Sequence, residues 1–377
     1  MQITLFSFLS AVLWSSVLII AIYFLRKSKH YKHYFGVLSI VLLYLFCAAR
    51  VFLPIELPHT YVIGNDTIYP QIYKLLVNEN EVVGGISLYQ ILIAIWVSVF
   101  IVLMVRYIGN YYKALKSIKQ YAVPYGEDED RILGEVKSLA RKDIKVSVLM
   151  TGNISVPFGF GLFRKKILLP FGNYPEDELR YILLHEYTHF INRDIPVKLL
   201  ISFFCMIFWW NPVVYLLKKD LEQTLEIKCD LALAKHLNPQ ERAAYLWTII
   251  NTLKRDCAQT MPPCAATAFF NYNSAAETKE RFAAVMNCDK GKYHVVTNAL
   301  FMCIFVFLLH FSYSVVPQPV FEAPKSTEQD AVDFNPSNSY IQQEANGEYW
   351  LYIKNTRYLP VAEEEVEFYK NTGFLIY

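Results

Sequence analysis

The chain has 377 residues, of which 54% are hydrophobic, compared with roughly 45–50% in soluble globular proteins. Its mean hydropathy is +0.24, and this composition argues against an ordinary soluble domain and predicts a membrane protein. The formal net charge is +2, from 36 basic and 34 acidic residues. Charge therefore gives no reason to expect direct contact with nucleic acid.

Four apolar windows are long enough to cross a bilayer core, which takes about 20 residues of helix. We predict a transmembrane helix in each of them, at residues 3–25, 35–53, 86–105 and 295–316. The first window lacks a basic leader and a small-residue cleavage site, so we expect a retained anchor rather than a removed signal peptide.

The distribution of Lys and Arg predicts the orientation, because these residues collect in cytoplasmic loops. Four basic residues lie within 26–32, whereas the loop 54–85 holds one basic and four acidic residues. Residues 1–110, with the first three helices, are therefore expected to begin outside the cell and to end in the cytoplasm. The region 111–294 is then cytoplasmic and the tail 317–377 external, in a multi-pass membrane protein.

The seven cysteines all lie in predicted membrane or cytoplasmic segments. This distribution predicts reduced thiols and argues against a disulfide framework. No pair has CxxC spacing, so a zinc site built on cysteines is not expected.

The segment "YPEDELRYILLHEYTHFINRD" predicts a helix of about five turns, with Pro175 at its first position. His185 and His189 are four residues apart, so both imidazoles lie on one face and can bind one metal ion. Glu186 is offset by one residue and can act as a general base without being a ligand. The alternative is an exposed helix whose two histidines have ordinary hydrogen-bond partners.

A catalytic zinc ion needs a third protein ligand, and the downstream segment "LEQTLEIKCD" offers carboxylates. Glu222, Glu226 and Asp230 follow one another at intervals of four residues, so they share one helical face. Glu226 and Asp230 form an ExxxD pair, in which one carboxylate can bind zinc and the other can orient a histidine. The alternative is a solvated acidic stripe beside neighbouring lysines. The HExxH motif formed by His185, Glu186 and His189 outweighs this alternative.

An apolar segment over about 195–217 separates His189 from Glu226. One straight crossing would place these two residues on opposite sides of a core about 30 Å thick, whereas zinc ligands lie about 2 Å from one ion. Asn211 and Pro212 form a natural helix break. We therefore predict a bent or hairpin-like segment that returns to the cytoplasmic side, or one that lies along the membrane interface.

Two β-rich runs, "IKVSVLM" and "KKILLP", predict strands of a small sheet on either side of "VPFGFGLFRK". Phe158, Gly159, Phe160 and Gly161 are candidate substrate-binding residues, because glycines allow close approach of a peptide backbone that could add to the sheet as a strand. A plain hairpin turn is the alternative.

Taken together, these segments resemble the BlaR/MecR-type antirepressor metallopeptidases, integral-membrane zinc proteases of bacteria. The resemblance rests on "VPFGFGLFRKKILLP", "HEYTHFINRD", "FWWNPVVYLL" and "LEIKCD", in that order, and on the layout of residues 1–316. It implies a mainly α integral membrane protein, in which a gluzincin-like α+β zinc protease domain is embedded among four transmembrane helices.

By matching positions, the resemblance implies that His185, His189 and Glu226 bind Zn²⁺ and that Glu186 is the general base. Asp230 and Asp194 match positions behind the ligands, and the role of Asp194 is the less defined. In the family, an external signal activates the cytoplasmic protease, which cleaves itself before the last helix and leads to loss of a gene repressor. The expected partners are these protein substrates and membrane lipids, without direct nucleic-acid contact, and a homodimer stays open.

The external tail departs from the family pattern. The β-lactam receptors carry a penicillin-binding domain, whereas this tail has 61 residues and the chain contains no Ser-x-x-Lys, so sensing by acylation is not expected. Residues 348–369 predict a small strand-rich module, and a disordered tail is the alternative.

Other functions stay open at this point. A CAAX-type or quality-control membrane metalloprotease shares both the HExxH and ExxxD motifs. A site-2-type protease is disfavoured, because Asn211-Pro212 is followed by valines rather than by an aspartate ligand. A non-catalytic receptor or immunity protein with a structural zinc site is also disfavoured, since such a site has no use for Glu186.

Overall fold

The computed structural model describes residues 5–27, 37–54, 61–65, 70–71, 88–126, 129–258, 275–288, 295–319, 335–344 and 347–377. The chain is mostly helical and divides into two compact units. The first unit is Met1–Asn65 with Gln71–Gln318, and the second is Asp66–Pro70 with Pro319–Tyr377.

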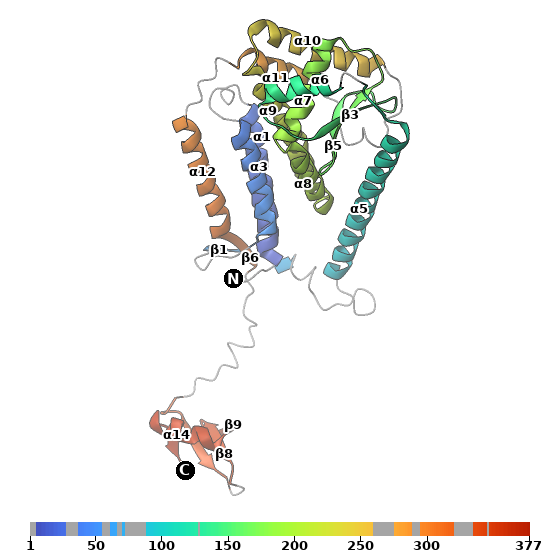
Figure 1. Ribbon diagram of the computed structural model, residues 1–377. Helices are drawn as coiled ribbons and strands as arrows, with labels where there is room; N and C mark the ends of the chain where they lie inside the picture. The colour runs from blue at the N-terminus through green and yellow to red at the C-terminus, as the bar shows by residue number, and fades with distance from the viewer. Residues whose placement is uncertain are drawn as a thin grey trace. The chain divides into compact units, whose positions relative to one another are not determined.

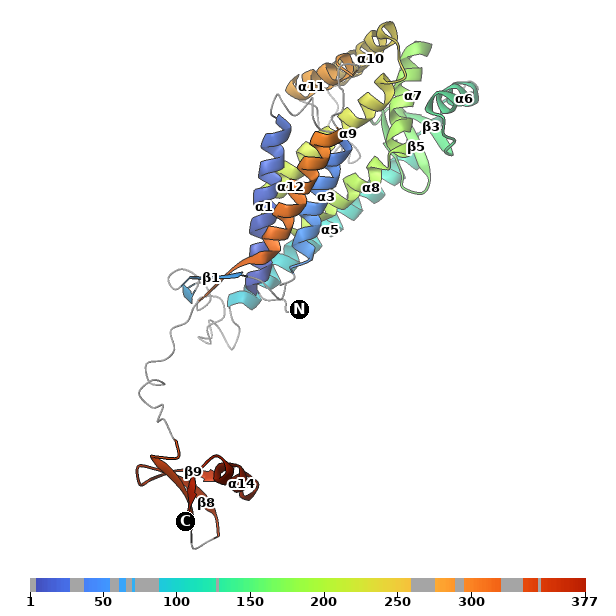
Figure 2. The same cartoon turned by 90° about the vertical axis from the view of Figure 1, so that its left-hand side faces the viewer.

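Apolar helices occupy all four predicted windows, as Figures 1 and 2 show: α1 (Leu5–Lys27), α3 (Val37–Phe52), α5 (Leu88–Tyr121) and α12 (Val295–Ser314). Among the described residues, two stretches are long and apolar enough to cross a membrane, Ser7–Lys27 and Leu88–Tyr121. Ser39–Phe52 and Met302–Ser314 are shorter apolar helices. The crossing of a membrane by all four stays a prediction.

A buried polar cluster joins the N-terminal helix to α9 (Pro212–Ala234), which packs against α1 and α3. Arg26 of α1 forms a two-point ion pair with Asp220 of α9, with 2.7 Å between Nε and Oδ2. The Tyr44 hydroxyl donates to the same carboxylate at 2.6 Å, and Arg26 also contacts Glu280 at 2.8 Å. The surrounding core is apolar and includes side chains from α1, α3, α9 and α12.

A four-stranded sheet lies in the order β2-β3-β5-β4 and comprises β2 (Val123–Pro124), β3 (Val146–Thr151), β4 (Phe158–Phe160) and β5 (Lys165–Pro170). The strands β3 and β5 are parallel, and β4 runs antiparallel to β5 at the edge of the sheet. The candidate substrate segment is therefore an edge strand followed by a turn at Gly161, where φ is +94° and a Cβ would lie 2.1 Å from the Arg164 carbonyl oxygen.

Helix α7 (Glu176–Ile191) packs against β4 and β5 of this sheet, and α6 (Glu129–Ala140) and α10 (Pro239–Ala258) pack against α7. Helix α11 (Ala275–Met286) packs against α9 and α10 (Figure 1). The predicted histidine-bearing helix is α7, which begins one residue later than expected, because Pro175 is its N-cap. It also ends earlier than expected, at Ile191, and Arg193 then adopts a left-handed conformation with φ of 57°.

The apolar segment between the two motifs is a pair of helices rather than one span. Helix α8 (Asp194–Ile207) ends before Phe208, and α9 begins at Pro212 and packs back against α8. The Asn211 side chain accepts a hydrogen bond from the Val213 N–H at 3.0 Å, so it caps the new helix. The proline therefore starts a helix, and the chain doubles back as the spacing of the motifs requires.

The described part of the tail is folded, and the disordered alternative is wrong for it. Its sheet has the order β10-β7-β8-β9, and a helix connects β9 to β10. The elements are β7 (Ser339–Gln343), β8 (Tyr349–Ile353), β9 (Thr356–Val361), α14 (Glu363–Asn371) and β10 (Leu375–Ile376). Ile341, Leu351, Ile353 and Val361 form its core. In the first unit, β1 (Tyr61–Asn65) pairs with β6 (Val315–Pro319).

Candidate metal centre

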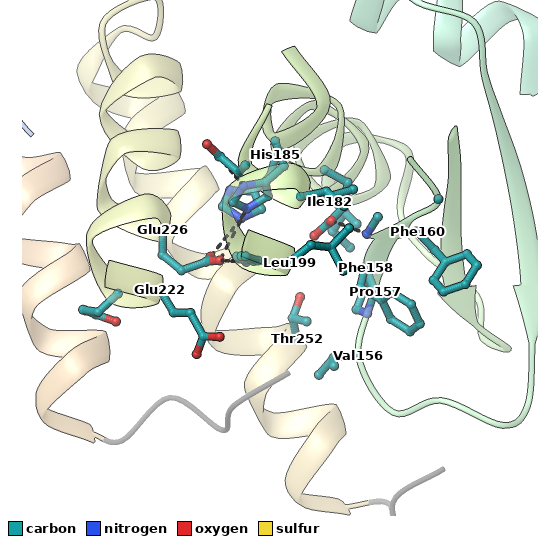
Figure 3. A pocket seen from close by; sticks show the side chains of 18 of the residues that line it. Val156, Pro157, Phe158, Phe160, Ile182, His185, Leu199, Glu222, Glu226 and Thr252 are labelled. Atoms are coloured by element: carbon teal, nitrogen blue, oxygen red, sulfur yellow. Dashed lines mark hydrogen bonds and ion pairs between the residues drawn. The ribbon is translucent and has the colours of Figure 1, made fainter. Parts of the chain in front are cut away.

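The packing of α7 against α9 brings together two imidazoles and one carboxylate. The Nε2 atoms of His185 and His189 are 3.2 Å apart. Oε2 of Glu226 lies 3.4 Å from His185 Nε2, and Oε1 lies 3.5 Å from His189 Nε2. Figure 3 shows the His185 and Glu226 side chains pointing toward each other.

These three donor groups fit a tetrahedral zinc ion. Ligand atoms about 2.0–2.1 Å from one ion, at tetrahedral angles, are separated from one another by about 3.3 Å. The two Nε2 atoms are 3.2 Å apart, and each lies 3.4 or 3.5 Å from a different oxygen of Glu226, so the three donor groups are spaced closely enough to share one ion. Two imidazoles and a glutamate also form a donor set of catalytic zinc sites, which keep one position open.

A carboxylate holds each histidine from behind. Oδ2 of Asp194 lies 2.8 Å from His189 Nδ1, and Asp194 is completely buried and contacts Lys228 at 2.9 Å. Because Asp194 begins α8 directly after the left-handed turn, this turn aims the carboxylate at the histidine. An acceptor at Nδ1 leaves the lone pair of Nε2 for a metal.

His185 is held by several buried residues that contact one another. His185 Nδ1 lies 2.9 Å from the Tyr245 hydroxyl and 3.4 Å from Oδ1 of Asp230. Tyr245 donates to Asp230 at 2.5 Å, and Arg281 pairs with the same carboxylate at 2.6 Å. Asp230 has no exposed side-chain surface, so the alternative of a solvated acidic stripe is wrong for it.

The electrostatics of this cluster favour a cation. Burial lowers the pKa of His185, but Cys229 and Glu226 outweigh it and raise the value to about 10. For Glu226, burial raises the pKa, whereas Lys198 and His189 more than offset it and hold the value well below the usual range. The carboxylate is therefore ionised beside the two imidazoles, and a metal ion that binds here must displace the histidine protons.

Cys229 is a neighbour that sequence reasoning missed. Its Sγ lies 3.6 Å from His185 Nδ1, and His185, His189 and Cys229 could also be grouped as three donors within 4.8 Å. We favour Glu226 as the third ligand, because its oxygens face Nε2 of both histidines, whereas Cys229 approaches the Nδ1 edge of His185. The thiol also donates to the His185 carbonyl oxygen at 3.3 Å. Only the EIKCD spacing could have signalled it.

The candidate base, Glu186, lies between the histidines and the edge strand. The Gly159 N–H donates to its Oε2 at 2.7 Å. A Cβ at position 159 would lie 3.0 Å from Cζ of Phe190, so the close approach of β4 to α7 favours a glycine here.

A cavity of about 700 Å³ opens in front of the histidines. It is bordered by the predicted metal and base residues, by Phe158, Gly159, Phe160 and Gly161, and by side chains of α5, α8 and α10. Figure 3 shows Leu199 and Thr252 on its walls. Glu222 also lines it, 3.9 Å from Lys218, and does not join the cluster that faces the two histidines. The cavity therefore joins β4, Glu186 and the two histidines in one space.

Two neighbouring histidines that face one glutamate, with a second carboxylate held beside them, are typical of metallopeptidases. The family model "BlaR1 peptidase M56" matches residues 5–285, and the chain belongs to this family of metallopeptidases, which are generally zinc-dependent. The resemblance found in the motifs is thereby confirmed.

Individual relatives share less than 30% of their residues with the matched part of the chain. The chain is 28% identical over 218 residues to the methicillin resistance mecR1 protein of Staphylococcus aureus, covering 56% of this chain and 36% of that protein. It is 26% identical over 198 residues to the regulatory protein BlaR1 of Bacillus licheniformis, covering 52% and 32%. The chain thus spans about a third of the length of the curated relatives it matches.

Proposed function

We propose that the protein is a membrane-embedded zinc endopeptidase that transduces a signal. The observation that carries this proposal is the coincidence of donor spacings for a tetrahedral ion, 3.2 to 3.5 Å, with a carboxylate held by an edge strand in the same cavity. His185, His189 and Glu226 would hold the ion, and Glu186 would be the general base.

The residues of the chain divide the work of peptide hydrolysis. When bound, zinc supplies a Lewis acid that polarises the scissile carbonyl and acidifies a water molecule. Glu186 accepts the proton of the attacking water and delivers it to the leaving amine. The Gly159 N–H fixes the orientation of that carboxylate, and β4 pairs with the substrate backbone at its free edge.

The proposed architecture is a gluzincin-like domain among four transmembrane helices, with its site on the cytoplasmic side of a bacterial cell membrane. The cluster of basic residues at 26–32 supports this orientation. The return of the chain between α8 and α9 keeps both motifs on one side. The N-terminus and the tail are then external, and the folded module over 335–377 is suited to sensing.

The proposed substrates are the protein itself and a cytoplasmic transcriptional repressor, cleaved or lost in response to an external signal. The names of the relatives, "Regulatory protein BlaR1" and "Methicillin resistance mecR1 protein", support a regulatory role. Comparative proteomics of cells that carry the wild type or Glu186→Gln tests this role. We expect cleavage of this chain, loss of one repressor, or both, only with the wild type.

Many unrelated cleaved membrane proteins would instead favour a quality-control protease. Identical peptide profiles in the two strains would contradict the proposed endopeptidase.

A further inference from the structure

Lys198 is a cation of the cavity wall that the proposed reaction has not yet used. It lies on α8, one helical turn after Asp194. Its Nζ is 3.1 Å from Oε1 of Glu226, and its side chain is 25% exposed. Because it lines the cavity, the ammonium group stands beside the predicted metal ligand and also faces the substrate space.

The other two cations of the site are held more firmly from behind. Arg281 directs Nε and Nη2 to Asp230, at 2.6 and 2.9 Å, while its Nη1 lies farther from Glu226, at 3.5 Å. Lys228 donates to Asp194 at 2.9 Å. Lys198 has three N–H donors, and within the described part of the chain its hydrogen bond is to Glu226. It therefore retains donors that can turn toward a bound substrate.

The charges of the site also leave a role for this group. Four carboxylates surround the cluster: Glu186, Asp194, Glu226 and Asp230. Three cations pair with them: Lys198, Lys228 and Arg281. With both histidines neutral, as metal ligands must be, a bound dication would leave these groups with one positive charge in excess. Such a site stabilises a negative charge that develops during the reaction.

We propose that Lys198 is a catalytic residue that stabilises the oxyanion formed during peptide hydrolysis, a role that rests on the proposed function. As the water oxygen bonds to the carbonyl carbon, the π electrons of the carbonyl move to its oxygen, and the Lys198 ammonium donates a hydrogen bond to it. The C–N bond then breaks, and Glu186 passes the water proton to the amine. The lysine neither gains nor loses a proton.

The test uses the full chain in detergent and the best-cleaved member of a panel of quenched-fluorescent peptides with apolar residues at the scissile bond. Lys198→Met should lower kcat about 10²–10³-fold, the usual effect of removing one oxyanion donor, with KM changed little and zinc content unchanged. Lys198→Arg should recover part of kcat. The matched control is Lys218→Met, on α9, whose ammonium contacts Glu222 instead, and it should behave as the wild type.

The affinity for inhibitors distinguishes oxyanion stabilisation by Lys198 from a role in which Lys198 only positions Glu226. A phosphonamidate dipeptide mimics the tetrahedral anion, and Lys198→Met should lower its binding affinity by the same factor as kcat. The affinity of the matching carboxamide should stay unchanged. Equal weakening of both ligands, loss of zinc in parallel with activity, or an unchanged kcat would each overturn the role. If Lys198→Met does not fold, Lys198→Gln and Lys198→Arg provide the same comparison.

A failure of the proposed function is recognised separately. It would appear as peptide cleavage by Glu186→Gln at the wild-type rate, or as no cleavage of any peptide by the wild type, and either result would overturn both proposals. A normal Glu186→Gln defect with an unchanged Lys198→Met kcat would overturn the lysine role alone.

Discussion

The backbone N–H of Gly159 donates a hydrogen bond to Oε2 of Glu186 at 2.7 Å. This contact joins the edge strand β4 to the helix that carries both histidines. A main-chain donor cannot rotate away as a side chain can, so the carboxylate is oriented by the sheet itself. The strand that would bind a substrate is therefore linked directly to the base that would act on it.

Replacing this glycine tests the contact between Gly159 and Glu186 directly. In Gly159→Ala, the added Cβ would lie 3.0 Å from Cζ of Phe190 and 3.5 Å from Oε2 of Glu186, so the Phe190 ring or the strand beside Glu186 must shift by a few tenths of an ångström. We expect cleavage to fall at least about tenfold, because small displacements of reacting groups are costly, while zinc content stays normal. Gly134→Ala on α6, where nothing lies within 4 Å, is the control. Equal activity of the two variants would contradict this role of Gly159.

The zinc content of two variants can identify the third metal ligand. Glu226→Ala should reduce the zinc content of the purified protein, because its oxygens face Nε2 of both histidines. Cys229→Ala should retain zinc, because Sγ lies at the Nδ1 edge of His185. Elemental analysis after dialysis measures both variants. The reverse pattern would make the thiol the ligand and remove Glu226 from the site.

The support behind His189 should affect metal affinity. Asp194→Ala removes the carboxylate 2.8 Å from Nδ1, and partners of this kind typically contribute about 10–100-fold to affinity. Competition with a fluorescent zinc chelator measures the change. Asp177→Ala, on the same helix as the histidines and with a side chain 88% exposed, should bind zinc as the wild type does. A similar affinity in both variants would show that Asp194 does not support the site.

The buried pair between Arg26 and Asp220 should matter for stability. Their side chains are 6% and 2% exposed, and removing one partner of such a pair costs about 3–5 kcal/mol. Asp220→Asn should therefore lower the free energy of unfolding by about that amount in detergent. In the double variant Arg26→Met with Asp220→Asn, the loss should be smaller than the sum of the losses of Arg26→Met and Asp220→Asn alone. Additive losses would show that the pair contributes no coupling.

Local periodicity predicts much of the candidate site. Residues four apart share a helical face, so the spacings of the two histidines and of Glu226 with Asp230 are informative without a structure. The turn between α8 and α9 follows from the need to bring two motifs to one ion, and Asn211 with Pro212 supplies the start of the second helix. The assignment of ligands itself stays a prediction.

Contacts between distant segments could not be predicted in this way. Tyr245 reaches His185 from 60 residues away, and Arg281 reaches Asp230 across 51 residues. Neither residue lies in a recognisable motif. The same holds for Lys198, which reads as an isolated charge in an apolar segment until the packing of α8 against α9 places it beside Glu226. Boundaries were also missed, since α5 continues to Tyr121, well beyond the predicted window.

The central claim is that a carboxylate next to a two-histidine, one-glutamate zinc centre catalyses peptide hydrolysis. The most direct measurement compares zinc content and peptide cleavage for purified full-length wild type and Glu186→Gln. The variant should contain as much zinc as the wild type and cleave about 10²–10⁴-fold more slowly, the usual contribution of a general base. Undiminished cleavage by a zinc-loaded Glu186→Gln protein would contradict the account.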